Sequence, residues 1–163
     1  MAGSIPIVRQ ISLVSLVPQL LLMGLLIYGC YLLKLDDPFM RGTLIYLILS
    51  YVLRVAVPKA HRQGVKLVKQ RKFVEAIPLF ESSIAFFARH PWVDKYRFLT
   101  LLSSSKISYR EMALCNIAFC YSQLGWGIKA QQCYETILAE YPENGLAQAG
   151  LNMLNSMSIP RNL

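Results

Sequence analysis

Two long apolar stretches, separated by a short polar interruption, fill roughly the first third of the chain. Residues 11–33 contain no charged side chain. A helix of that length covers about 34 Å, which is enough to span a bilayer. Residues 34–41 are polar and contain an Asp-Pro turn signal, and a second apolar stretch follows over residues 42–57. The pattern predicts a transmembrane helical hairpin in a membrane domain of residues 1–57.

The second apolar stretch is the weaker of the two. It would cover only about 24 Å as a helix, and it contains Arg54. It spans the bilayer if the Arg54 guanidinium reaches the headgroup level while its stem stays in hydrocarbon, and otherwise it lies in the interface. A cleaved signal peptide is the competing interpretation of the first stretch. That stretch is too long for a usual signal sequence, and no small-residue cleavage site follows it.

After Pro58 the apolar positions recur at spacings of three and four, which predicts successive amphipathic helices. Ser108 and Glu111 have the spacing of a capping box at the start of one helix. Two glycines within residues 124–127 end that helix, and a further helix over residues 128–141 stops at the turn of residues 142–145. A last helix is expected over about 145–157. The chain is therefore predicted to be all-α.

Residues 58–157 resemble the tetratricopeptide repeat family, whose unit is a 34-residue helix pair with small and large residues at fixed positions. The second copy, about residues 111–144, matches the family spacing at Ile117, Ala118, Tyr121, Gly125, Ala130, Tyr134 and Pro142. The first copy, about residues 57–90, matches more loosely at Gly64, Leu67, Phe73, Ala76, Phe80 and Ser83. An insertion of about residues 88–108 separates the copies. The resemblance implies an antiparallel helix array over residues 58–163, with a capping helix at about 145–157.

The resemblance also implies a groove, lined by the first helix of each pair, that holds a peptide or helix of a protein partner. The groove-facing positions would be His61, Val65, Val68, Cys115, Asn116, Phe119 and Ser122. Such a groove would be mostly apolar. A partner peptide, a helix or a subunit of a membrane complex fits it, and homo-oligomers are possible.

The net charge of +8 is concentrated in a basic run that starts where the second apolar stretch ends. Between residues 54 and 72 the chain has seven basic residues and no acidic residue. Such a run is typical of a cytoplasmic flank beside anionic lipid, and is less typical here of nucleic-acid binding. The residues expected to contact lipid headgroups are Arg54, Lys59, Arg62, Lys66 and Lys69. The C-terminal domain is accordingly predicted to be cytoplasmic.

The sequence contains no recognisable catalytic, metal or cofactor motif. His61 and His90 lie far apart without a carboxylate at metal spacing, and none of the four cysteines forms a CxxC pair. We therefore expect no catalytic residue, no metal and no cofactor. Two hypotheses follow: a membrane-anchored scaffold or assembly factor that recruits a protein partner, or a structural accessory subunit that packs through its hairpin in a larger membrane complex.

Overall fold

The computed structural model describes residues 13–158, and within this range the chain is helical and contains no strand, as predicted. The helices group into two compact units. The first, called the hairpin unit here, comprises residues 13–59 and 90–106, and the second, the array unit, comprises residues 60–89 and 107–158. Each unit is described separately below.

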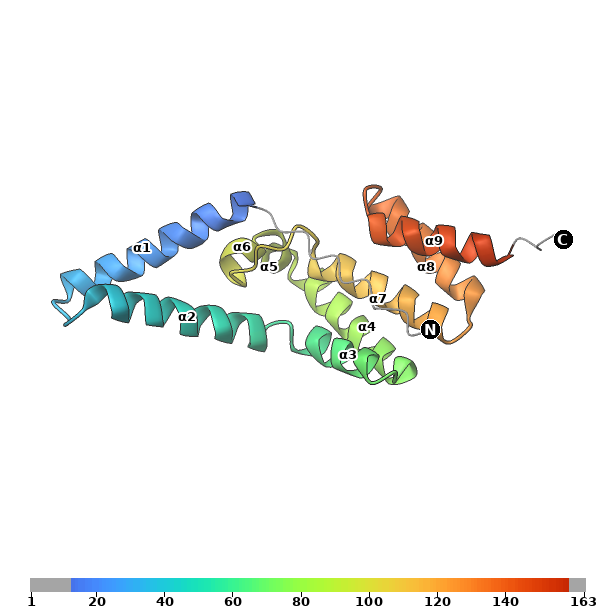
Figure 1. The fold of residues 1–163 in the computed structure, drawn as a ribbon, viewed down its shortest axis with the longest axis horizontal. Helices are drawn as coiled ribbons and strands as arrows, with labels where there is room; N and C mark the ends of the chain where they lie inside the picture. Colours follow the sequence, from blue (N-terminus) through green and yellow to red (C-terminus); the bar gives the residue numbers. More distant parts are fainter. Residues whose placement is uncertain (1–12, 159–163) are drawn as a thin grey trace. The chain divides into compact units, whose positions relative to one another are not determined.

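The hairpin unit begins with a 3₁₀ turn, η1 (Leu13–Ser15), followed by α1 (Leu16–Leu32) and α2 (Pro38–Ala56), which pack side by side (Figure 1). The connection reverses direction through Lys34 and Asp37, which adopt left-handed backbone conformations with φ of 52° and 49°. Pro38 occupies the first turn of α2, where its missing N–H costs no helical hydrogen bond.

The two hairpin helices differ from the predicted spans in their relative lengths. The second, predicted as the shorter span over residues 42–57, begins four residues earlier and has 19 residues, or about 28 Å. The helix begins earlier because proline is favoured in the first turn of a helix, and Pro38 occupies that position. The first turn also adds Phe39 and Met40 to the exposed apolar surface. The first has 17 described helical residues, and residues 11–12 of its predicted span lie outside the described range.

The array unit consists of antiparallel helices that pack in chain order. Its helices are α3 (Lys59–Lys69), α4 (Phe73–Arg89), α7 (Tyr109–Gln123), α8 (Gly127–Glu140) and α9 (Gly145–Ser158). Helix α4 packs on α7, α7 on α8, and α8 on α9, as can be followed in Figure 1. Helix α3 lies against α4, where a Cβ on Gly64 would come within 2.8 Å of the Phe80 ring.

Two hydrophobic clusters hold the array together. One forms between α3, α4 and α7 from Val68, Ala76, Ile77, Phe80, Ala113, Ile117 and Cys120. The other forms between α7, α8 and α9 from Ala118, Ala130, Tyr134, Ile137 and Ala147. Small residues allow the helix backbones to approach, and a Cβ on Gly150 would overlap the Tyr134 ring. Burial of apolar side chains between neighbouring helices therefore accounts for the stacking, and α7 contributes to both clusters.

The helix boundaries of the second half agree closely with the sequence patterns. Ser108 and Glu111 form the predicted capping box, with the Ser108 hydroxyl 3.1 Å from the Glu111 backbone nitrogen. Gly125 has a φ of 74°, a conformation that favours glycine, directly after α7. The predictions of these caps and of the last two helices are confirmed.

The insertion between the two helix pairs does not extend α4. It forms two short helices, α5 (Pro91–Lys95) and α6 (Arg97–Thr100), followed by an irregular stretch. Residues 90–106 belong to the hairpin unit, and α6 packs against α1. The structure thus differs from the predicted division, in which the whole of residues 58–163 formed one domain.

Candidate interaction surfaces

The outer surface of the hairpin is unusually apolar. Of the 26 large hydrophobic side chains that are exposed in the described chain, 18 belong to residues 13–52. On α2 they include Leu44, Leu47, Ile48 and Tyr51, and on α1 Leu20, Leu21 and Leu25. Soluble proteins rarely expose extensive apolar patches, so this surface is a candidate site of contact with lipid or with other apolar helices.

The inner contact of the hairpin has the opposite character. Its buried residues are small or polar: Gln19, Cys30, Gly42 and Ser50. The backbones approach closely at Gly42, where a Cβ would lie 2.6 Å from Ile27 Cα. An apolar exterior around a small and polar contact is typical of helices that pack within a bilayer, where lipid supplies no hydrophobic force between helices.

Among the described residues, α2 is the one helix of sufficient length and apolar composition to cross a membrane. Only 11% of the most apolar 18-residue stretch of α2 is buried, whereas the core helix of a soluble protein is mostly buried. Helix α1 is also apolar but is shorter.

Arg54, near the end of α2, has an internal partner. Its guanidinium donates hydrogen bonds to the carbonyl oxygen of Leu102 through Nε, at 3.0 Å, and through Nη2. Leu102 is fully buried and has a φ of 47°, an uncommon conformation for a branched side chain. The residue predicted to contact lipid headgroups thus joins the hairpin to residues 90–106.

The other four predicted headgroup residues are exposed and share one face of α3. Lys59, Arg62, Lys66 and Lys69 follow one another at spacings of three and four. His61, Gly64 and Val68 form the buried face of the same helix. Helix α3 is therefore strongly amphipathic, and the charged side chains of its exposed face are all basic, which suits an anionic partner surface.

The residues predicted to line a peptide groove mostly pack inside the array. His61 and Val68 are buried, with 6% and 3% of their surface exposed. Val65 and Phe119 pack against the first hydrophobic cluster, whereas Cys115 packs against the second. The structure thus places the predicted groove residues in two separate packing environments.

The polar members of the predicted groove bond within the array. Asn116 donates to the Met112 carbonyl at 2.9 Å, and Ser122 to the Ala118 carbonyl at 3.0 Å. Burial raises the pKa of the Cys115 thiol to about 11, so that the thiol stays protonated at neutral pH. These three side chains are half-buried and already satisfied.

His61 is enclosed by aromatic rings. Its imidazole meets Phe80 and Tyr109 edge to face, with ring centroids 5.5 Å and 5.4 Å away. Burial lowers its pKa to about 4, so the ring is neutral at physiological pH. Its Nδ1 has no hydrogen-bond partner among the described residues. The imidazole is a packed core group.

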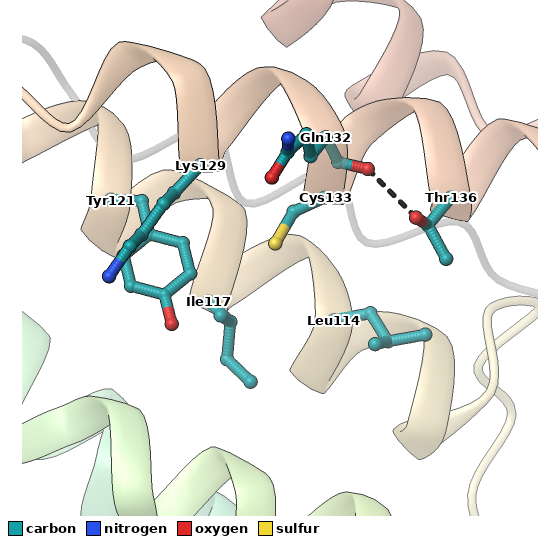
Figure 2. A pocket seen from close by; sticks show the side chains of 7 residues that line it. All are labelled: Leu114, Ile117, Tyr121, Lys129, Gln132, Cys133 and Thr136. Atoms are coloured by element: carbon teal, nitrogen blue, oxygen red, sulfur yellow. Dashed lines mark hydrogen bonds between the residues drawn. The ribbon is translucent and has the colours of Figure 1, made fainter.

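A surface depression that sequence reasoning missed lies between α7 and α8 (Figure 2). It has a volume of about 360 Å³ and is lined by Leu114, Ile117, Tyr121, Lys129, Gln132, Cys133 and Thr136. The α7 residues recur at spacings of three and four, which indicates a helix face but does not separate an open face from a buried one. Sequence periodicity alone therefore could not have located the depression.

The rim of the α7–α8 depression is cationic and aromatic. The Lys129 ammonium lies 4.8 Å from the centroid of the Trp126 ring and 5.8 Å from that of Tyr121. Ile117 and Leu114 supply apolar surface beside it, and Cys133 adds a thiol whose pKa burial raises. This arrangement suits an apolar side chain of a partner that also carries a nearby carboxylate.

A buried polar network holds the ends of three helices together. Asn144 donates to Glu111 Oε1 at 2.8 Å and to Cys115 Sγ at 3.3 Å, and its Oδ1 accepts from the Ala147 backbone N–H at 2.7 Å. Arg110 forms an ion pair with Glu140 nearby. The network fixes the α8–α9 turn on the start of α7.

The described residues contain no cluster of histidine, cysteine or acidic side chains that could hold a metal ion. In comparisons with known proteins, no family model, no curated protein and no solved structure matches the chain.

Proposed function

We propose that this protein is a membrane-anchored interaction module, in which the hairpin inserts into the bilayer and the helix array binds a protein partner. The observation that carries the proposal is the reversed polarity of the hairpin. Large apolar side chains such as Leu25 and Leu47 are exposed, while the polar side chains of Gln19 and Ser50 are buried. Water would penalise that arrangement and a bilayer would favour it.

The array is proposed to have tetratricopeptide-type geometry. Ala118 and Ala130, at small positions of the resembled unit, are fully buried, and Tyr134 fills the space beside them. Gly64, at the corresponding small position of the first copy, closely approaches Phe80. These contacts support a stack of helix pairs with α9 as the cap.

The partner-binding surface is proposed to include the α7–α8 depression. Its apolar lining and the exposed Lys129 beside Trp126 favour a partner segment with an apolar anchor next to an acidic residue. The exposed basic face of α3 offers a second site for negatively charged groups, either of lipid headgroups or of the same partner.

The array is proposed to face the cytoplasm. Seven basic residues follow between residues 54 and 72, whereas the hairpin turn carries Lys34 and Arg41 beside two aspartates. Arg41 lies 3.7 Å from Asp36, which offsets its charge. Basic residues in short flanks resist translocation, so the positive flank stays on the cytoplasmic side.

Anchoring is tested by alkaline extraction of membranes that contain the full chain. The chain should remain with the lipid pellet and be released by detergent alone. Complete release by alkali would contradict insertion of the hairpin.

Partner binding is tested by photocrosslinking from membranes. A photoreactive residue in place of Gln132, on the depression rim, should give one dominant adduct that Lys129→Glu abolishes. The same residue in place of the exposed Gln148 on α9 is the matched control. Adducts of equal yield at both positions would contradict the assignment. An adduct formed only from Leu47, on the hairpin, would instead favour the accessory-subunit function.

A further inference from the structure

Residues 90–106, called the base segment here, form a small structure held by backbone-directed hydrogen bonds. Arg97 donates to the carbonyl oxygens of Asp94, at 2.9 Å, and Ser105, at 2.9 Å, and also to that of Lys106. The Thr100 hydroxyl donates to the Val93 carbonyl at 2.7 Å. A guanidinium that satisfies three carbonyls gives this irregular stretch a defined shape without a large core.

The base segment is attached at the open end of the hairpin, away from its turn. Arg54, two residues before α2 ends at Ala56, donates to the Leu102 carbonyl, and α6 packs against α1. Leu101 and Leu102 are fully buried. If α2 spans the bilayer, the base segment lies at the level of its charged end, which is the headgroup region.

One face of the base segment is apolar, and no element of the described chain covers it. Trp92, Tyr96 and Leu99 follow at spacings of four and three and are 58%, 45% and 45% exposed. Tryptophan and tyrosine are the residues enriched where a bilayer meets water, because each combines an apolar ring with a polar group. The side chain of Lys95 lies over the Tyr96 ring, 5.7 Å from its centroid.

The exposed lysines of the base segment are Lys95, which lies over the Tyr96 ring, and Lys106. Asp94, the acidic residue of the segment, is buried. Basic side chains beside an aromatic face complement anionic headgroups, at about 1 kcal/mol per residue close to the surface.

We infer that the base segment is a second membrane contact, with Trp92, Tyr96 and Leu99 seated among the lipid headgroups on the side of the array. The inference rests on the proposed insertion of the hairpin. Its support is that this aromatic face belongs to the same compact unit as the exposed apolar surface of the hairpin, together with the exposed basic residues of the segment. In this arrangement the Arg54 guanidinium donates to the Leu102 carbonyl at the boundary between hydrocarbon and headgroups, where a charged side chain has to leave the hydrocarbon.

Tryptophan quenching in reconstituted vesicles tests the inference, because the chain contains two tryptophans, Trp92 and Trp126. The full chain is reconstituted into phosphatidylcholine and phosphatidylglycerol vesicles whose acyl chains carry bromine. The variant Trp126→Phe reports on Trp92, and Trp92→Phe reports on Trp126, an exposed residue of the array unit, as the matched control. A third variant, Leu25→Trp with both native tryptophans replaced by phenylalanine, reports on hairpin insertion.

The expected result is quenching and a blue-shifted emission for Trp92, with bromine near the headgroup end of the chain quenching more than bromine deep in the bilayer. Trp126 should lose little intensity, and the tryptophan placed at position 25 should be quenched most by deep bromine. Quenching at position 25 without quenching of Trp92 overturns the inference and leaves the anchor intact. Absence of quenching at position 25 overturns the anchor and the inference with it. Equal quenching of Trp92 and Trp126 also overturns the inference, because the base segment would then not be the specific contact.

Discussion

The hairpin and the array are built from the same kind of secondary structure but distribute their apolar residues in opposite ways. In the array, Phe80 and Ile137 are fully buried, and far fewer large hydrophobic side chains are exposed than in the hairpin. In the hairpin, Phe39 and Leu47 are exposed, while Gln19 and Ser50 are buried. The comparison shows that helices of the same geometry can be suited to different surroundings. Large apolar side chains on the inner face suit a helix in water, and large apolar side chains on the outer face suit a helix in lipid.

The largest expected effect is the difference in stability loss between two phenylalanine truncations, one in the array and one in the hairpin. Phe80→Ala should destabilise the array by about 3–5 kcal/mol, because it leaves a cavity at the contact of three helices. Phe39→Ala, at a residue that is 71% exposed, should leave the unfolding of the array unchanged. Denaturant melts of the full chain in detergent micelles measure both. Equal losses would mean that the hairpin also buries its large side chains against protein.

The next effect is a pH dependence centred on His61. Its pKa falls from 6.5 in the unfolded chain to about 4 in the fold, because burial penalises the charged ring. As pH drops from 6.5 toward 4 the unfolded state takes up a proton that the folded state does not. The free energy of unfolding should therefore decrease by about 3 kcal/mol over that window. The stabilisation is fully present above pH 6.5.

His61→Phe is the control for this pH dependence, because it keeps an aromatic ring between Phe80 and Tyr109 and removes the titrating group. The difference between the two chains in melts near pH 7 and near pH 4 isolates the histidine from the carboxylates. If both chains lose stability equally on acidification, His61 is not a buried neutral group.

A smaller effect is expected at the close contact between the hairpin helices. Gly42→Ala places a methyl group against the Ile27 backbone and should destabilise the hairpin by about 1–3 kcal/mol. Gly24→Ala is matched to it, since nothing lies within 4 Å of a Cβ there. The distance between spin labels on the two helices reports hairpin separation, and it should increase for Gly42→Ala alone. An unchanged distance in both variants would show that the helices do not approach at Gly42.

The smallest effect concerns the capping box of α7. Ser108→Ala removes the hydroxyl that accepts from the Glu111 backbone N–H and should cost about 1 kcal/mol. Ser82→Ala, at an exposed position within α4, should leave stability nearly unchanged. Thermal melts followed by circular dichroism distinguish the two variants, and a loss at Ser82 as large as that at Ser108 would be inconsistent with a specific cap.

Local signals in the sequence predicted the features that depend on neighbouring residues. The Ser108 cap, the glycine turn after α7 and the last two helices each follow from side chains within a few positions of one another. Helix α2 begins four residues before the predicted apolar span of residues 42–57, because Pro38 starts the helix within the stretch that the sequence pattern assigns to the polar interruption.

The features that could not be predicted depend on contacts between residues far apart in the chain. His61 meets Tyr109, 48 positions away, and that contact converts an expected groove residue into a core residue. Arg54 meets Leu102, also 48 positions away, and that contact assigns the insertion to the hairpin unit. Helical periodicity indicates which residues share a face but not which element covers that face.

The central claim is that the exposed apolar surface of the hairpin faces lipid. The most direct test is electron paramagnetic resonance of nitroxide labels placed one at a time at Leu44, Leu47, Ile48 and Tyr51 on α2, in reconstituted vesicles. Each of these positions is exposed in the structure, so a label there does not disturb the contact with α1. The account predicts that molecular oxygen, which concentrates in hydrocarbon, relaxes all four labels, while a water-soluble nickel chelate reaches none of them. Relaxation of the same labels by the nickel chelate, with little effect of oxygen, would contradict the account.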